Sequence, residues 1–95
     1  MRLNDYQIQA NETAIYPEGL NYPILGLAGE AGEICNKYKK ILRDKEGEAD
    51  VNDIDQLAKE LGDVLWYVAQ IATELGTDLE TVARVNIMKL GDRKE

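Results

Sequence analysis

The sequence contains no histidine, and this absence narrows the chemistry that the chain can perform. It removes the most common general base, the usual zinc ligands and the Glu-x-x-His pairs of di-iron helical bundles. A metal ion bound here would have to be held by oxygen atoms. Oxygen ligands favour magnesium, manganese or calcium.

Cysteine is represented by Cys35 alone, so no disulfide can form within one chain. Because Cys35 falls on the apolar face of a predicted helix, we expect it to be a buried small hydrophobic residue. No apolar run approaches the ~20 residues that a membrane span needs. Residues 1–10 also lack the apolar core of a secretory signal. We therefore expect a cytoplasmic protein with no membrane partner.

Positive charge is scarce, since 11 lysine and arginine residues face 18 aspartate and glutamate residues and leave a net charge of −7. Polymeric nucleic acid is therefore not expected as a partner, because such binding depends on neutralising phosphates. A small phosphorylated substrate remains compatible with this charge if metal ions screen it. The 95 residues predict one domain, covering 1–95, and a monomer of this size would be only marginally stable.

Hydrophobic periodicity and capping residues predict an all-α fold with four helices and no strand. The first helix is predicted over residues 3–14 and is followed by a turn at 16–19. The second is predicted from about 23 to 43. Its predicted apolar stripe consists of Ile24, Leu27, Ala31, Ile34, Cys35, Tyr38 and Leu42.

A loop over residues 44–51 precedes the third predicted helix, for which Asn52 or Asp53 would be the N-cap and Leu75 the last residue. Gly76 then suits the position just after the end of a helix. The fourth helix is predicted over 78–92, with Thr77 and Glu80 as a capping box.

The segment from Val64 to Ala72 is apolar nearly all round, with Gln70 as its only strongly polar residue. Such a helix is buried on every side. The other three helices could wrap it, or it could form an interface between subunits. The small size of the chain favours the interface. We therefore predict a four-helix bundle completed by oligomerisation, as a dimer or a tetramer.

Two pairs of acidic residues have helical spacing: Glu30 with Glu33, and Glu60 with Asp63. Residues three apart share a helix face, so each pair projects two carboxylates in one direction. A single pair of this kind is usually an ordinary solvated face. Here, however, both pairs border the apolar stripe of their helix and small residues surround them. A cation between two such pairs would turn their mutual repulsion into a binding site.

Lys37 and Lys40 continue the acidic face of the second helix. They could contact a phosphate beside the metal, or Lys37 could simply pair with Glu33 one turn earlier. Tyr67 lies one turn beyond Asp63 on the same face. There it could contact a substrate, or it could simply belong to the core. Trp66 points elsewhere, which suggests interface packing or part of a neighbouring subunit's pocket.

At these residues the sequence resembles the MazG-like nucleotide pyrophosphohydrolases of the all-α NTP pyrophosphatase superfamily. The stretches LGLAGEAGEICNKYKKILRD (25–44) and KELGDVLWYVAQIATELG (59–76) carry the Glu-x-x-Glu and Glu-x-x-Asp elements. NIMKLGDR (86–93) is similar to the family's third motif, and YQIQANETAIYP also resembles the family. Many members continue into a tail containing glycine and arginine, which has no counterpart in the printed sequence after Glu95.

This resemblance implies hydrolysis of a (deoxy)nucleoside triphosphate to a monophosphate and pyrophosphate, as nucleotide-pool housekeeping. It implies Mg²⁺, with Mn²⁺ as the alternative, at Glu30, Glu33, Glu60 and Asp63. Glu33, and with it Glu30, would be catalytic. The implied substrate-binding residues are Lys37, Lys40, Tyr67, Asn86, Lys89 and Arg93.

Asn86, Lys89 and Arg93 share one face of the fourth predicted helix, and we expect Asn86 to point into the bundle. A solvated basic turn at the helix end would explain Lys89 and Arg93 but not Asn86. The alternatives to a MazG-like enzyme are an all-helical dUTPase, a phosphoribosyl-ATP pyrophosphatase and a non-catalytic helical oligomer that binds a partner.

Overall fold

The computed structural model describes residues 1–92, and over this range it contains four helices and no strand. The helices are α1 (Leu3–Glu12), α2 (Asn21–Lys45), α3 (Val51–Glu74) and α4 (Leu79–Asp92). The predicted all-α class and the order of the helices are confirmed. None of the helices in the described range is both long enough and apolar enough to cross a lipid bilayer.

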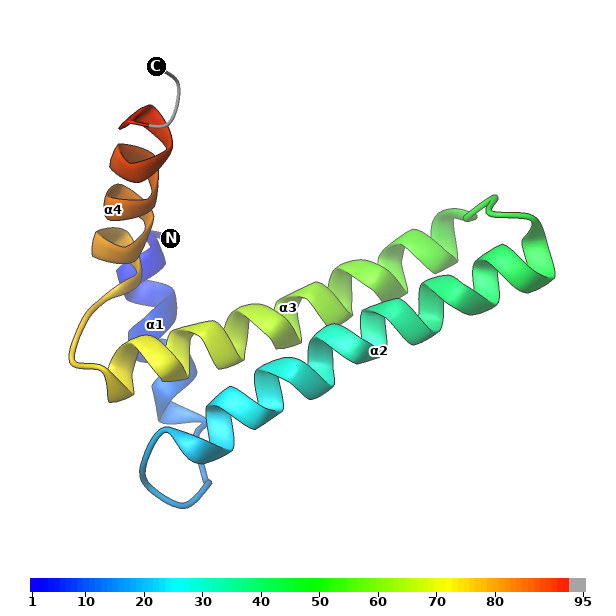
Figure 1. The fold of residues 1–95 in the computed structure, drawn as a ribbon. Coiled ribbons are helices and arrows are strands. Elements are labelled where there is room, and N and C mark those ends of the chain that lie inside the picture. The colour runs from blue at the N-terminus through cyan, green and yellow to red at the C-terminus, as the bar shows by residue number, and fades with distance from the viewer. Residues whose placement is uncertain (93–95) are drawn as a thin grey trace.

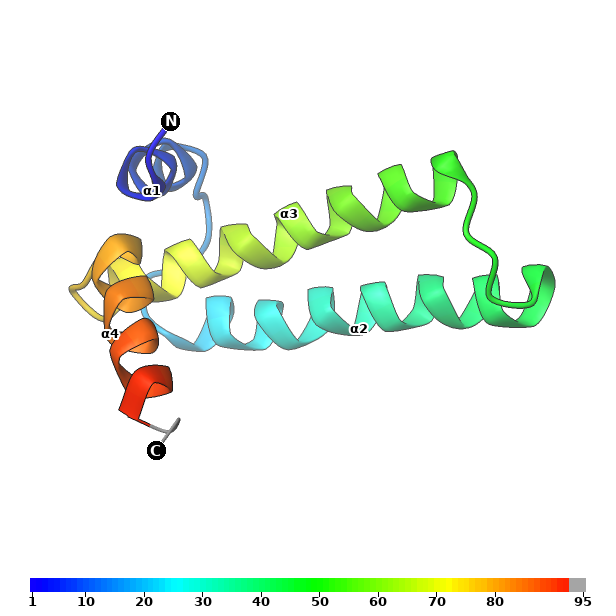
Figure 2. The same cartoon turned by 90° about the horizontal axis from the view of Figure 1, so that it is seen from above.

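The two longest helices, α2 and α3, form an antiparallel hairpin, and the two short helices pack at its open end (Figures 1 and 2). Seen from above, α1 lies against the last turns of α3 and α4 leads away from the hairpin (Figure 2). The two short helices also pack against each other. The middle of the hairpin is therefore left without a covering layer from the same chain.

The ends of the hairpin helices differ from the prediction by a few residues, for local chemical reasons. α2 begins at Asn21, which places Pro23 in the first turn, where its missing N–H leaves no hydrogen bond unmade. α3 begins at Val51 because Asp50, and not Asn52 or Asp53, is its N-cap. The Asp50 carboxylate accepts from the backbone N–H of Asp53, and the Asp53 carboxylate accepts from the backbone N–H of Asp50.

The fourth helix is capped by Asp78, so the predicted capping box of Thr77 and Glu80 is wrong. The Asp78 carboxylate accepts from the Thr81 backbone N–H at 2.8 Å. Two further N–H groups at this helix start are bound from α1. Gln7 accepts from Leu79, and Asn4 accepts from Glu80. The start of α4 is thus held by α1.

A small core joins the short helices to the end of α3. It contains Ala10, Ala69, Ala72 and Leu79, with Trp66 among the residues packed against it. The Trp66 indole N–H donates to the Thr13 hydroxyl at 2.8 Å. Trp66 is thus half-buried by its own chain, and the expectation that it serves an interface stays a prediction.

The apolar stripe predicted for α2 is rotated relative to the face that contacts α3. The buried and half-buried positions of α2 include Pro23, Leu27, Glu30, Ile34, Lys37 and Ile41. Part of the predicted stripe points away from α3 and is exposed: Ile24, Cys35, Tyr38 and Leu42. The expected burial of Cys35 is therefore wrong within a single chain.

The apolar segment of α3 is not fully wrapped by the other three helices. Ala69 and Ala72 are buried, but Leu65 remains 38% exposed. The radius of gyration is 15.9 Å, whereas a compact chain of this length has about 12 Å. The fold of one chain is thus more extended than a self-sufficient domain.

Candidate metal centre and active site

The hairpin brings three carboxylates together midway along its length. Glu30 comes from α2, and Glu60 and Asp63 come from α3. One carboxylate oxygen from each residue lies within 4.8 Å of the other two. Three oxygen donors from two packed helices form an arrangement that can hold a hard divalent cation.

Glu30 carries the electrostatic signature of this crowding. Burial raises its pKa above the ordinary value, and the nearby charges of Asp63 and Glu60 raise it further, together with a hydrogen bond to Glu60. All of these effects disfavour the ionised carboxylate. A cation placed among the three groups would reverse the like-charge contribution.

Lys37 supplies one positive charge to the cluster. Its ammonium lies 2.8 Å from Oε1 of Glu60, whose side chain is only 16% exposed. This hydrogen bond is the main reason why the pKa of Lys37 is raised. The simple pairing of Lys37 with Glu33 along α2 is therefore replaced by an ion pair across the hairpin.

Glu33 is not among the converging carboxylates. It is exposed on α2, although its charge contributes to the raised pKa values of both Glu30 and Lys37. The structure thus brings together three of the four predicted metal ligands and leaves Glu33 beside them. The ligand and catalytic roles of these residues stay predictions.

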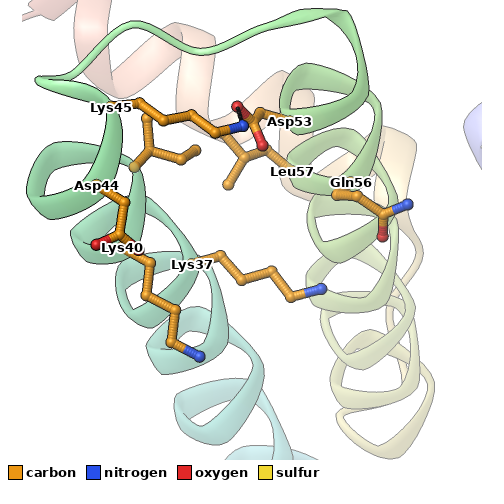
Figure 3. Close-up of a pocket in the computed structure, with 8 residues that line it drawn as sticks. Lys37, Lys40, Asp44, Lys45, Asp53, Gln56 and Leu57 are labelled. Atoms are coloured by element: carbon orange, nitrogen blue, oxygen red, sulfur yellow. Dashed lines mark hydrogen bonds and ion pairs between the residues drawn. The ribbon is translucent and has the colours of Figure 1, made fainter.

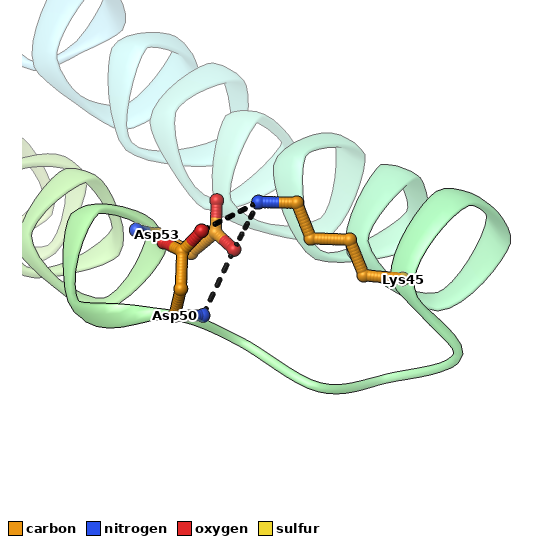
Figure 4. Close-up of polar contacts among 3 residues, drawn as sticks. All are labelled: Lys45, Asp50 and Asp53. Atoms are coloured by element: carbon orange, nitrogen blue, oxygen red, sulfur yellow. Dashed lines mark hydrogen bonds and ion pairs between the residues drawn. The ribbon is translucent and has the colours of Figure 1, made fainter.

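A pocket between α2 and α3 lies between the cluster and the closed end of the hairpin. Lys37 and Lys40 line it from α2, and Figure 3 shows the Lys37 side chain reaching across toward α3. The far end of the pocket is closed by Lys45, whose ammonium binds both Asp50 and Asp53 (Figure 4). Sequence reasoning missed Lys45, because its partners belong to the start of the opposite helix.

On the other side of the cluster, toward the open end of the hairpin, the seam between the helices is aromatic. The Tyr67 ring packs against Gly26 so closely that a Cβ at this glycine would collide with it. The ring of Tyr22 lies 6.3 Å from that of Tyr67 and stacks on Tyr16 at 5.0 Å. Burial, followed by a hydrogen bond with Tyr22, raises the pKa of Tyr67.

The predicted site residues of α4 lie apart from this cluster. Asn86 and Lys89 are exposed, and in the described residues α4 packs on α1 and α3 but not on α2. The expectation that Asn86 points into the bundle is therefore wrong for a single chain. Arg93 lies outside the described residues.

One polar residue on the seam was missed as a candidate by sequence reasoning. Gln70 has no exposed surface, and neither its Nε2 nor its Oε1 has a hydrogen-bond partner in the described part of the chain. The sequence offered one signal, because Gln70 interrupts an otherwise apolar segment.

Comparison with known protein families gives a match that covers most of the chain. Residues 21–95 match the family model described as the MazG nucleotide pyrophosphohydrolase domain. The chain belongs to this family. The match includes α2 and α3, which carry the carboxylates, and α4, whereas α1 lies outside it.

A relative of this MazG-family chain is the "Gene 37 protein" of Mycobacterium phage L5. The two are 52% identical over 103 residues, which cover all of this chain and 90% of the relative. No solved structure matches the chain. The family assignment thus depends on sequence similarity, and the geometry above is that of this chain itself.

Proposed function

We propose that this protein is a magnesium-dependent pyrophosphohydrolase that converts (deoxy)nucleoside triphosphates to a monophosphate and pyrophosphate, in nucleotide-pool housekeeping. The observation that carries the proposal is the convergence of Glu30, Glu60 and Asp63 within 4.8 Å in a member of the MazG family. Helices with Glu-x-x-Glu and Glu-x-x-Asp spacing are common on solvated surfaces. A three-carboxylate cluster from two packed helices is much less easily explained by solvation alone.

The donor set suits the proposed metal. It contains only carboxylate oxygens, which magnesium and manganese accept. Burial, and then the charges of Asp63 and Glu60, raise the pKa of Glu30, and a cation would relieve the repulsion among these charges. When bound, the cation would offset the charge of the triphosphate and make a nearby water more acidic.

The remaining roles belong to residues around the cluster. Glu33 is exposed at its edge and is proposed as the general base that removes a proton from the attacking water. Lys37 would leave Glu60 once a cation neutralises that carboxylate, and with Lys40 it would contact the phosphates through charge-assisted hydrogen bonds. Tyr67 would then face the sugar or the base.

We further propose that a second copy of the chain covers the exposed hairpin. The accessible surface is 7048 Å², about 1,500 Å² more than the ~5,500 Å² typical of a compact 10.7 kDa protein. A standard interface buries about 800 Å² on each partner, so the excess is sufficient for one. The open apolar surface includes Leu61, Leu65, Leu75, Val82 and Val85.

A second copy would also explain why α4 lies apart from the carboxylate cluster of its own chain. Asn86 and Lys89 could approach a nucleotide at the carboxylates of the partner chain, because α4 leads away from its own hairpin (Figure 1). Light scattering at micromolar concentration should therefore give the mass of a dimer or a tetramer. A stable monomer that is fully active would contradict this part of the proposal.

The activity itself is tested by measuring pyrophosphate release from a panel of nucleoside triphosphates with and without Mg²⁺. Glu60→Gln should lower the rate by orders of magnitude, while Glu48→Gln, at an exposed loop position, should not. Release from dUTP alone, or from phosphoribosyl-ATP alone, would identify the narrower relatives. No release from any of these substrates would leave a non-catalytic oligomer.

A further inference from the structure

The two buried glutamines, Gln7 and Gln70, differ in their hydrogen bonds. Gln7 uses both ends of its amide, bonding the Thr73 hydroxyl, the Thr77 carbonyl and the Leu79 N–H. Gln70 is 0% exposed, and both polar atoms of its amide are unpaired among residues 1–92. Buried polar atoms are nearly always hydrogen-bonded in native proteins, because an unpaired atom is destabilising. The amide of Gln70 therefore calls for a partner that is not part of the chain.

The surroundings of Gln70 explain why the described residues supply no partner. Tyr67 packs against Gly26, and Asp63 lies beside Glu30. In an antiparallel pair this register places Gln70 level with Pro23, which has no N–H and no polar side chain. Pro23 is itself fully buried. On the side facing α1, the neighbouring α3 residue Ala69 shares its apolar cluster with Ala10.

Gln70 is also aligned with the proposed metal centre. Asp63, Tyr67 and Gln70 are spaced i, i+4 and i+7, so they follow one face of α3. Seven residues of helix correspond to about 10 Å along the axis. A nucleotide with its phosphates at the carboxylates could therefore lay its sugar and base along the Tyr67 ring, with the base edge toward Gln70.

We propose that the Gln70 amide reads the hydrogen-bonding edge of the substrate's nucleobase, and so sets the base preference of the enzyme. This inference depends on the proposed function. A primary amide offers one donor group and one acceptor, which complement a base edge carrying a neighbouring acceptor and donor. Tyr67 provides a flat face for stacking beside it.

Because Gln70 has no exposed surface, a base can reach its amide only if neighbouring side chains move. Tyr67 is held against Gly26, whereas Tyr22 lies in the first turn of α2 and is 49% exposed. Tyr22 is therefore the ring that we expect to swing aside when a base enters. Its place would be taken by the base, which preserves an aromatic contact with Tyr67.

The test compares the wild type with Gln70→Met, which keeps an unbranched side chain of similar length and removes the amide. Gln9→Leu, at an exposed position of α1, is the control. The kcat/KM for each of the four common deoxynucleoside triphosphates and the Tm without nucleotide are measured. We expect Gln70→Met to reduce the ratio between the best and the poorer bases about tenfold or more, with an equal or higher Tm.

The two proposals fail in different ways. Pyrophosphate release by a wild type that shows no base preference would overturn the role of Gln70 and leave the proposed function intact. A lower Tm for Gln70→Met with an unchanged preference would also overturn it, because the amide would then be satisfied by structural water. If Gln70→Met does not fold, Gln70→Leu provides the same comparison. Absence of release from every substrate by the wild type would overturn both proposals.

Discussion

Replacing Glu30 by glutamine should stabilise the metal-free protein, although it removes a proposed metal ligand. Glutamine keeps the volume of the side chain and removes one of three crowded negative charges. Two unit charges about 5 Å apart interact by roughly 3 kcal/mol at an effective dielectric constant of about 20. Solvent exposure and the charge of Lys37 reduce this value, so we expect a gain of about 1 kcal/mol. For a chain of this size this corresponds to a rise in Tm of about 4–8 °C.

The pH dependence of this gain has a definite sign. The pKa of Glu30 is raised from its ordinary value of 4.5, so the folded state binds this proton more tightly than the unfolded state. The wild type therefore loses stability as the pH rises through the raised pKa. The advantage of Glu30→Gln should be absent below about pH 4 and should grow as the pH rises through the raised pKa.

Thermal melts of the two proteins from pH 4 to 8, with and without Mg²⁺, measure this effect. Magnesium should raise the Tm of the wild type and raise that of Glu30→Gln much less, because stabilisation by a ligand follows its affinity for the folded state. Glu48→Gln, at an exposed loop position, is the control. A variant that melts at or below the wild-type temperature at pH 7 would refute the reasoning from charge crowding.

Other substitutions around the site should change stability or nucleotide binding, and not all in the same direction. Glu60→Gln also removes one of the three crowded charges but breaks the ion pair with Lys37, so it should raise the Tm of the metal-free protein less than Glu30→Gln does, or lower it; a gain as large as that of Glu30→Gln would mean that this pair contributes nothing. Lys37→Ala should raise the KM for the nucleotide more than the apparent Kd for Mg²⁺, measured by kinetics and by magnesium titration, and equal changes would count against a phosphate contact. Gly26→Ala should destabilise the protein by about 1–3 kcal/mol in denaturant melts, because the new methyl group meets the Tyr67 ring. Gly29→Ala, which meets open space, should be neutral or stabilising by up to ~1 kcal/mol, and equal effects of the two alanines would contradict the packing.

The sequence predicted the helices better than the faces that they bury. The contact face of α2 includes Glu30 and Lys37, and a search for apolar periodicity cannot count these residues. It selected instead the more uniformly apolar face with Tyr38 and Leu42, which the chain leaves exposed. The predicted stripe is therefore rotated away from the true contact face, because polar residues occupy part of that face.

Contacts between distant parts of the chain account for the other errors. Trp66 bonds Thr13, 53 positions away, so nothing local could predict this contact. Asn86 was expected to face the bundle because its helix was assumed to lie along the hairpin, whereas α4 packs at the open end. The convergence of Glu30 with Asp63 was predictable, because both lie on the two longest helices and close to the apolar faces.

The bonds that α1 makes to the start of α4 bear on how the chain folds. The hydrogen bond between Gln7 and Leu79 joins residues 72 positions apart, which is most of the chain. Contacts of such wide separation have a high loop-closure cost and slow a folding reaction. The turn between α2 and α3 involves only neighbouring segments, so we expect the hairpin to assemble first. The acidic cluster would then exist before the two ends of the chain have met, and a divalent cation present during refolding should accelerate the first phase more than the last.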